Sequence, residues 1–89
     1  MSLISKYCGN MNLTGKEIRN YRLKNNLSYE QLSAKLELLG ISIHKQSLYD
    51  IENNKRTVKD FELFGLAYIL KIDISKLYDN ISKSFNSNL

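Results

Sequence analysis

The sequence of 89 residues has no proline, no tryptophan, one cysteine and one histidine. Because Cys8 has no second cysteine to pair with, the chain cannot form the internal disulfides that stabilise many small secreted domains. One cysteine and one histidine are also fewer than the four ligands of a structural zinc site. We therefore expect no metal site and no cofactor.

Long apolar runs are missing as well. The longest one spans only a few residues, whereas a membrane-spanning helix needs about 20, and residues 1–6 do not contain the apolar core of a signal peptide. We expect a cytoplasmic protein without a membrane partner. The chain can still fold as one small domain, because 43% of its residues are hydrophobic and nine are aromatic.

The positive charge is concentrated in the middle of the chain. Thirteen basic residues against nine acidic ones give a net charge of +4. Residues 14–59 hold nine basic and five acidic side chains, whereas residues 60–89 hold three and four. This distribution suits an anionic partner such as nucleic acid, although charge alone is weak evidence for one.

Capping residues and apolar spacing predict a series of short helices. Thr14 and Glu17 form a capping-box pattern at the first helix, Ser28 and Gln31 repeat it at the second, and Asp73 caps a short last helix. The helices are expected at Gly15–Asn25, Tyr29–Leu39, Lys45–Glu52, Asp60–Lys71 and around Leu77–Tyr78. Since no segment alternates in polarity as strands do, the fold class is all-α, a compact bundle of four to five short helices.

The second helix has the clearest core pattern. Leucines at i, i+4 and i+7 predict its buried face, namely Leu32, Leu36 and Leu39. Ala34 is small enough to admit a neighbouring helix, and Gly40 is expected to end the helix.

The chain divides into three parts. Residues 1–12 are predicted to be a flexible N-terminal arm, and residues 13–79 to form the folded domain. Residues 80–89 are either a polar C-terminal tail or an extension of the last helix, because apolar residues four apart continue through it, at Ile81, Phe85 and Leu89.

Three segments, in order and at nearly the right distances, resemble a Cro/phage-repressor (Xre-like) helix-turn-helix domain. They are Ile18–Ser33, Leu48–Arg56 and Leu66–Leu77. The resemblance covers about residues 14–79 and implies a recognition helix, braced by the helix before it, that enters the major groove of double-stranded DNA. It also implies a lengthened second helix and turn, because Leu36 and Ile51 lie 15 residues apart, more than in the compact family form.

In this interpretation the outward face of the third helix meets the bases, while Leu48 and Ile51 point inward. Lys45 can donate to guanine, Gln46 can pair with adenine, and Asp50 can accept from cytosine. The expected base contacts are therefore Lys45, Gln46, Tyr49 and Asp50. A solvated face without a partner is the alternative.

Phosphate contacts are expected at the start of the second helix, where amides and the helix dipole favour an anion, and around the end of the third. The expected residues are Ser28, Tyr29, Ser47, Asn53, Lys55, Arg56, Thr57 and Lys59. Ser28 is a helix cap first, and an idle polar turn is the alternative for Lys55 and Arg56. The resemblance also implies a structural ion pair between Arg22 and Glu52, and His44 is expected to be a cap or turn residue.

The resemblance implies a sequence-specific DNA-binding transcriptional regulator. One module contacts one half-site, so we expect a homodimer on a palindromic operator. Candidate residues for the dimer surface are Phe61, Phe64, Tyr68, Tyr78, Ile81 and Phe85, with core packing as the alternative for Phe61 and Phe64. The same fold occurs in antitoxin-like or partner-controlled protein-interaction modules, which is the second hypothesis. We find no catalytic motif and expect no enzyme activity.

Overall fold

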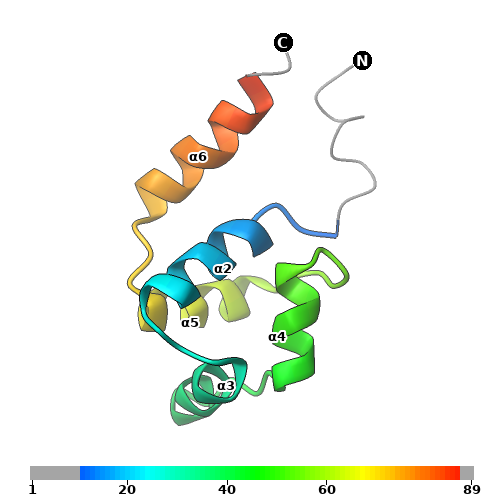
Figure 1. Ribbon diagram of the computed structural model, residues 1–89, viewed down its shortest axis with the longest axis vertical. Coiled ribbons are helices and arrows are strands. Elements are labelled where there is room, and N and C mark those ends of the chain that lie inside the picture. The colour runs from blue at the N-terminus through cyan, green and yellow to red at the C-terminus, as the bar shows by residue number, and fades with distance from the viewer. Residues whose placement is uncertain (1–10, 87–89) are drawn as a thin grey trace.

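A computed structural model describes residues 11–86, with side chains for residues 11–84 (Figure 1). This part of the chain forms five helices: α2 (Gly15–Lys24), α3 (Tyr29–Leu38), α4 (Lys45–Glu52), α5 (Asp60–Leu70) and α6 (Ile74–Asn86). No strand occurs among the described residues, and the predicted all-α bundle is confirmed. α4 has the predicted bounds, whereas α2, α3 and α5 each end one residue earlier. α6 is longer than the short last helix predicted around Leu77–Tyr78, because it has 13 residues and continues to Asn86. Of the two alternatives for residues 80–89, the extension of the last helix therefore applies through residue 86. Apart from its last two residues, the predicted N-terminal arm lies outside the described residues.

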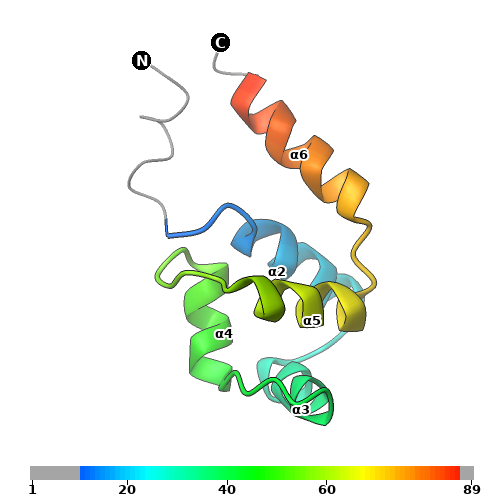
Figure 2. The same cartoon turned by 180° about the vertical axis from the view of Figure 1, so that it is seen from behind.

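α2 and α5 cross the middle of the bundle, with α4 along one side and α3 at the end opposite to α6 (Figures 1 and 2). α3 packs against α4 and α5, and α2 packs against the same two helices. Residues 39–44 connect α3 to α4, while α6 extends away from the other four helices. Among residues 11–86, no helix combines the length and the apolar character that spanning a membrane requires.

The core consists of aliphatic side chains from all five helices and from two of the connections. Its buried members are Ile18, Leu32, Leu36, Ile43, Leu48, Ile51, Leu66, Leu70, Ile72 and Leu77. The prediction that Leu39 is buried is wrong, since it is 42% exposed. α3 stops one residue before it, so Leu39 lies in the turn and Ile41 packs against the core.

The close helix approach expected at Ala34 occurs elsewhere. Ala34 is exposed, so that prediction is wrong. The tight contact lies instead at Gly65 of α5, where an added Cβ would be 2.4 Å from the side chain of Ile41 and 3.2 Å from that of Leu36. The α3–α4 connection folds back onto α5 at this point, and a side chain at residue 65 would force those of Ile41 and Leu36 to shift.

Two predicted helix starts are confirmed. Ser28 Oγ accepts a hydrogen bond from the Gln31 amide at 3.1 Å, and Gln31 Oε1 accepts one from the Ser28 amide at 2.9 Å. This reciprocal pair satisfies two amides that the first turn of α3 leaves free. At α6, Asp73 Oδ1 accepts from the amides of Ser75 and Lys76 at 3.0 and 3.3 Å.

The capping box predicted from Thr14 and Glu17 is wrong. The Thr14 side chain makes no capping bond to α2. Asn12 Oδ1 takes this role and accepts from the amides of Thr14 and Gly15 at 3.1 and 2.7 Å. Asn12 reaches them because an asparagine side chain readily bonds amides two and three residues further on. Glu17 faces α6, where Asn80 Nδ2 donates to its carboxylate.

Four helices end at a residue with left-handed backbone geometry. These residues are Asn26, Gly40, Asn54 and Lys71, with φ between 54° and 79°. In each case the next amide donates to the carbonyl five residues before it, at 2.8–3.2 Å. Glycine and asparagine tolerate this geometry, whereas other residues are strained in it by about 1–2 kcal/mol. Lys71 is therefore the strained member of this set.

Replacing Lys71 with glycine is expected to raise the free energy of unfolding by about 1 kcal/mol, because glycine has no Cβ to strain at a φ of 57°. The matched control is Lys35→Gly inside α3, which should lower the free energy by about 1 kcal/mol because glycine is a poor helix former. Urea denaturation measures both changes. A destabilised Lys71→Gly variant would show that the lysine is not strained.

Candidate nucleic-acid interface

α4 has one buried and one uncovered face. Leu48 and Ile51 are buried in the core. The exposed residues on the opposite face are Lys45, Gln46, Tyr49 and Asn53. At the edges of this face, Ser47 and Asp50 are half-buried. The side chains expected to meet bases therefore share the side of α4 that the protein leaves open.

Two pairs organise the N-terminal half of this face. Lys45 Nζ lies 3.3 Å from Glu30 Oε1 of α3, and both side chains are mostly exposed. Gln46 Nε2 donates to Asp50 Oδ1 at 3.1 Å, one helical turn further on. Because exposed ion pairs contribute at most about 1 kcal/mol, Lys45 can exchange Glu30 for another acceptor at little cost.

Tyr49 connects α4 to its surroundings on both sides. Its ring meets the ring of Tyr29 edge to face, with the centroids 6.1 Å apart. On the other side Lys55 Nζ lies 5.4 Å from the centroid of the Tyr49 ring. The ring of Tyr49 thus lies between the start of α3 and the turn after α4. Tyr49 is still 40% exposed.

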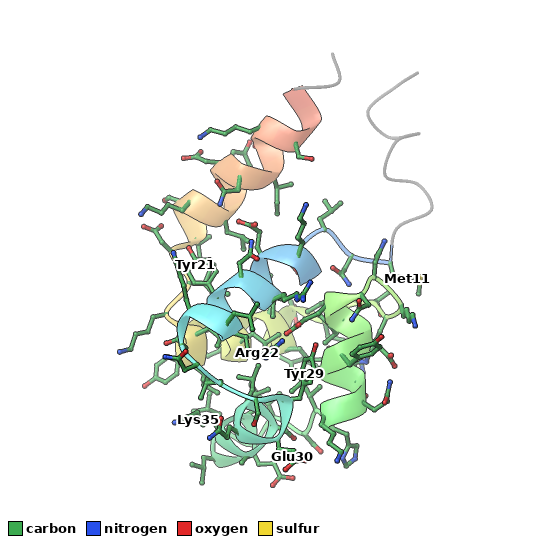
Figure 3. The ribbon with its side chains drawn as sticks, viewed as in Figure 1. Met11, Tyr21, Arg22, Tyr29, Glu30 and Lys35 are labelled. Atoms are coloured by element: carbon green, nitrogen blue, oxygen red, sulfur yellow. The ribbon has the colours of Figure 1, made fainter. Side chains whose placement is uncertain are left out.

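A buried ion pair holds the C-terminal end of α4. Arg22 Nε donates to Glu52 Oε2 at 2.7 Å, and Arg22 Nη2 donates to Glu52 Oε1 at 3.1 Å. The Tyr29 hydroxyl donates to the same Oε1 at 2.9 Å, and the Arg22 guanidinium lies 4.1 Å from the Tyr29 ring centroid. Figure 3 shows Arg22 and Tyr29 next to each other. These three side chains join α2, α3 and α4.

The network raises the pKa values of Arg22 and Tyr29. The hydrogen bonds to Glu52 raise the pKa of Arg22, so the guanidinium stays charged. Burial raises the pKa of the Tyr29 phenol, and the hydrogen bond that it donates to Glu52 adds to the effect. The neutral phenol therefore persists as the donor.

The two residues expected to bind phosphate at the start of α3 have different surroundings. Ser28 is exposed, and its Oγ accepts from the Gln31 amide while its own proton stays available. The Tyr29 hydroxyl is engaged by Glu52 and its side chain is half-buried. The structure thus places Tyr29 as a brace between helices.

The two adjacent cations in the turn after α4, Lys55 and Arg56, have different surroundings. Lys55 is exposed, as are the other expected phosphate contacts Asn53, Thr57 and Lys59. Arg56 instead donates from Nη1 and Nη2 to Glu62 Oε1 and Oε2, at 3.0 and 2.8 Å. Glu62 is only 3% exposed, so this second ion pair ties the turn to α5.

The Arg56–Glu62 pair is a feature that sequence reasoning missed. The hydrogen bonds from Arg56 lower the pKa of Glu62, and they raise the pKa of Arg56 in return. Glu62 Oε1 also accepts from the Lys59 amide at 3.0 Å, in the first turn of α5. The available signal was a glutamate three residues after Lys59, the residue that caps the helix, because acidic side chains cap from this position.

Asn12 is a second missed feature, because it lies in the segment predicted to be a flexible arm. Its Nδ2 donates to the carbonyls of Ile51 and Arg56 at 3.1 and 2.8 Å. Asn54 Oδ1 accepts in turn from the amides of Met11 and Asn12 at 2.7 and 3.1 Å, beside the turn after α4 (Figure 3). Two asparagines thus join the start of the described chain to the end of α4.

Gly15 allows the first turn of α2 to approach the backbone at the end of α4 closely. A Cβ at this position would lie 2.1 Å from the Ile51 carbonyl oxygen, which is backbone and cannot move aside like a side chain. α2 therefore begins directly against the end of α4. A glycine at the first position of a helix was the sequence signal for such a contact.

The candidate dimer residues fall into two groups. Phe61, Phe64, Tyr68 and Tyr78 are 53–70% exposed, which rules out core packing for the two phenylalanines. Ile81 is half-buried against the core, and the side chain of Phe85 lies outside the described residues. The rings of Phe64 and Tyr68 stack with centroids 6.4 Å apart, beside an open groove lined by Leu63, Ala67, Ile72 and Ile74.

His44 lies at the start of α4. Its backbone is extended, with φ −69° and ψ 155°, and its exposed side chain makes no capping bond. Within residues 11–86, no three His, Cys, Asp or Glu side chains are grouped so that they could hold a metal ion. The surface around α4 thus offers amide and hydroxyl groups, the ring of Tyr49, and charged groups of both signs, with Lys45 and Lys55 beside the carboxylates of Glu30 and Asp50.

Comparison with known proteins gives one match. The helix-turn-helix family model matches residues 18–77, about two thirds of the chain. The matched segment begins in α2 and ends in α6, so it contains all of α3, α4 and their connection. No curated protein and no solved structure matches the chain.

Proposed function

Because the chain belongs to the Cro/C1-type helix-turn-helix family of DNA-binding regulators, we propose that it recognises a specific DNA sequence by placing α4 in the major groove. The observation that carries this proposal is the uncovered face of α4, on which Lys45, Gln46 and Tyr49 point away from the core. An α-helix with its side chains is about 10–12 Å across, and the major groove is about 12 Å wide.

The three exposed side chains suit different base edges. Lys45 can donate to guanine O6 and N7 after it leaves Glu30, and the Gln46 amide can pair with the N6 and N7 edge of adenine. The ring of Tyr49 can pack on a thymine methyl group. The shared face of α4 would therefore read adjacent base pairs.

Contacts to the DNA backbone would hold α4 in register. At the start of α3, the free amides, the helix dipole and the Ser28 hydroxyl favour a phosphate. The residues around the end of α4 would contact phosphates on its other side, with Lys55 as the strongest cation: Ser47, Asn53, Lys55, Thr57 and Lys59. Since Arg56 is engaged by Glu62, we assign it to the structure of the turn.

Lys45→Ala and Gln46→Ala are each expected to relax base preference at one position by about 1–3 kcal/mol. Selection of preferred DNA from a random pool, followed by gel-shift titration with single-base variants, measures this preference. Variants that keep the base preferences of the unchanged protein would contradict the placement of α4 in the groove.

Lys55→Ala should weaken binding to all sequences nearly equally and reduce the slope of log affinity against log salt by about one. The matched control is Lys35→Ala, because Lys35 lies on the side of α3 that points away from α4 (Figure 3). The control should keep the salt slope of the unchanged protein. Equal slopes for both variants would remove Lys55 from the phosphate contacts.

We further propose that the chain binds a palindromic operator as a homodimer, with one α4 in each half-site. The stacked rings of Phe64 and Tyr68 and the mostly apolar groove beside them support this, because a contiguous exposed apolar surface marks an interaction site. In light scattering, the full chain is expected to be dimeric and Phe64→Glu monomeric. Leu38→Glu, at an 88% exposed leucine of α3, is the control that should remain dimeric.

The same aromatic surface also favours the second hypothesis, a module controlled by a protein partner. The two functions differ in their response to salt. Sequence-specific DNA binding predicts a steep fall of affinity as salt rises, because several phosphates are neutralised. A flat salt response together with tight binding of a protein partner would favour the interaction module.

A further inference from the structure

Gln46 and Asp50 form a pair on the open side of α4. Gln46 Nε2 donates to Asp50 Oδ1 at 3.1 Å, across the four-residue spacing at which glutamine and aspartate bond along a helix. Gln46 is exposed on this face, while Asp50 is half-buried at its edge. The carboxylate also interacts electrostatically with Arg56 in the turn after α4. Asp50 therefore has partners within the protein itself.

The carboxylate determines which way the glutamine amide faces. An ionised carboxylate can only accept hydrogen bonds, so the amide nitrogen of Gln46 must face Asp50 and the amide oxygen must point away. One N–H and the Oε1 acceptor of Gln46 then remain free. In the major groove adenine presents the acceptor N7 beside the N6 amino donor, and the free groups of Gln46 complement this edge.

We propose that Asp50 is a positioning residue, which holds Gln46 ready to pair with adenine, rather than a base contact that itself accepts from cytosine. This inference rests on the proposed function. A free glutamine side chain must lose its rotational freedom on binding, and fixing it beforehand is worth about two- to tenfold in affinity. Asp50 would supply this preorganisation from within α4.

The test compares the base preferences of four proteins, each selected against a random DNA pool and titrated with single-base variants: the unchanged chain, Asp50→Ala, Asp50→Asn and Gln46→Ala. The unchanged chain is expected to prefer adenine at one position. Gln46→Ala should lose that preference, and Asp50→Ala should reduce it about two- to tenfold. Asp50→Asn can donate as well as accept, so it no longer fixes the direction of the Gln46 amide and should reduce the preference less than Asp50→Ala does.

A double variant makes the test specific to orientation. If Asp50 acts through Gln46, adding Asp50→Ala to Gln46→Ala should change nothing further at the adenine position. Circular dichroism and thermal melting would show whether each variant keeps its fold. If Asp50→Ala does not fold, the comparison between the unchanged chain and Asp50→Asn decides the test.

Three outcomes would overturn the inference. Unchanged adenine preference in Asp50→Ala would show that Gln46 needs no positioning. A cytosine preference at a second position that disappears in Asp50→Ala would make Asp50 a direct base contact. Absence of any adenine preference in the unchanged chain would remove the pairing itself. If the unchanged chain selected no sequence at all, the proposed function itself would fail. That result differs from the three outcomes above, in which the chain still selects a DNA sequence and only the inference fails.

Discussion

Replacing Arg22 with alanine is expected to lower the free energy of unfolding by about 3–5 kcal/mol, because it leaves the Glu52 carboxylate buried without its charged partner. The side chains of Arg22 and Glu52 are only 9% and 1% exposed, so water cannot replace the lost bonds. Arg22 Nη1 also donates to the Leu27 carbonyl at 2.8 Å, and this support of the α2–α3 connection would be lost as well.

Chemical denaturation measures the stability of Arg22→Ala, and a gel shift measures its affinity for DNA. Both should fall, since the pair holds the end of the helix that we propose to contact the bases. Arg19→Ala on the same helix is the control, because Arg19 is exposed and its loss should cost less than about 0.5 kcal/mol. A loss of DNA affinity at unchanged stability would mean that Arg22 contacts DNA and does not brace α4.

Replacing Arg56 with alanine should lower the free energy of unfolding by about 2–3 kcal/mol, between the ranges for exposed and fully buried ion pairs. The intermediate value follows from the geometry, since Glu62 is 3% exposed at its side chain and Arg56 is 30% exposed. Lys55→Ala, one residue earlier, should leave the stability nearly unchanged. Denaturation of the two variants side by side tests this difference between neighbouring cations.

Arg56→Ala should also change the response of stability to acid. Hydrogen bonds from Arg56 lower the pKa of Glu62 below its ordinary value of 4.5. A carboxylate whose pKa is lowered by folding stabilises the protein above its unfolded pKa, and this stability disappears as the pH falls through the folded pKa. The unchanged chain should therefore lose stability below about pH 4.5, and Arg56→Ala should lose less.

The comparison between the two proteins tests Glu62, because its carboxylate accepts both side-chain hydrogen bonds from the Arg56 guanidinium. Identical slopes of stability against pH in the acid range would contradict the assignment of Arg56 as the main cause of the lowered pKa. Lys55→Ala should show the slope of the unchanged chain, since Lys55 does not contact Glu62.

Both ion pairs, together with Asn12, support the same part of the molecule. Glu52 ends α4, the Arg56–Glu62 pair joins the following turn to α5, and Asn12 Nδ2 bonds the Ile51 and Arg56 carbonyls. The open face of α4 thus depends on a rigid C-terminal end. We expect substitutions there to change DNA affinity through the orientation of α4.

Much of the fold could be predicted because its signals are local. The period of the apolar residues and the reciprocal cap of Ser28 and Gln31 act within a few residues, and they gave the correct bounds for α4 and the correct start of α3. The predicted burial of Leu39 failed at a helix end, where a one-residue difference removes a side chain from the core. The Thr14 cap failed because Asn12 competes for the same amides.

The sequence by itself determined helices α2 to α5, the inward direction of Leu48 and Ile51, and the outward direction of Lys45, Gln46 and Tyr49, since helical geometry and apolar periodicity require no distant partner. Only the tertiary structure decided that Arg56 binds Glu62 and that Asn12 reaches the carbonyl of Ile51, 39 residues away. Such contacts depend on the angles at which helices leave their turns, and no local pattern in the chain specifies those angles.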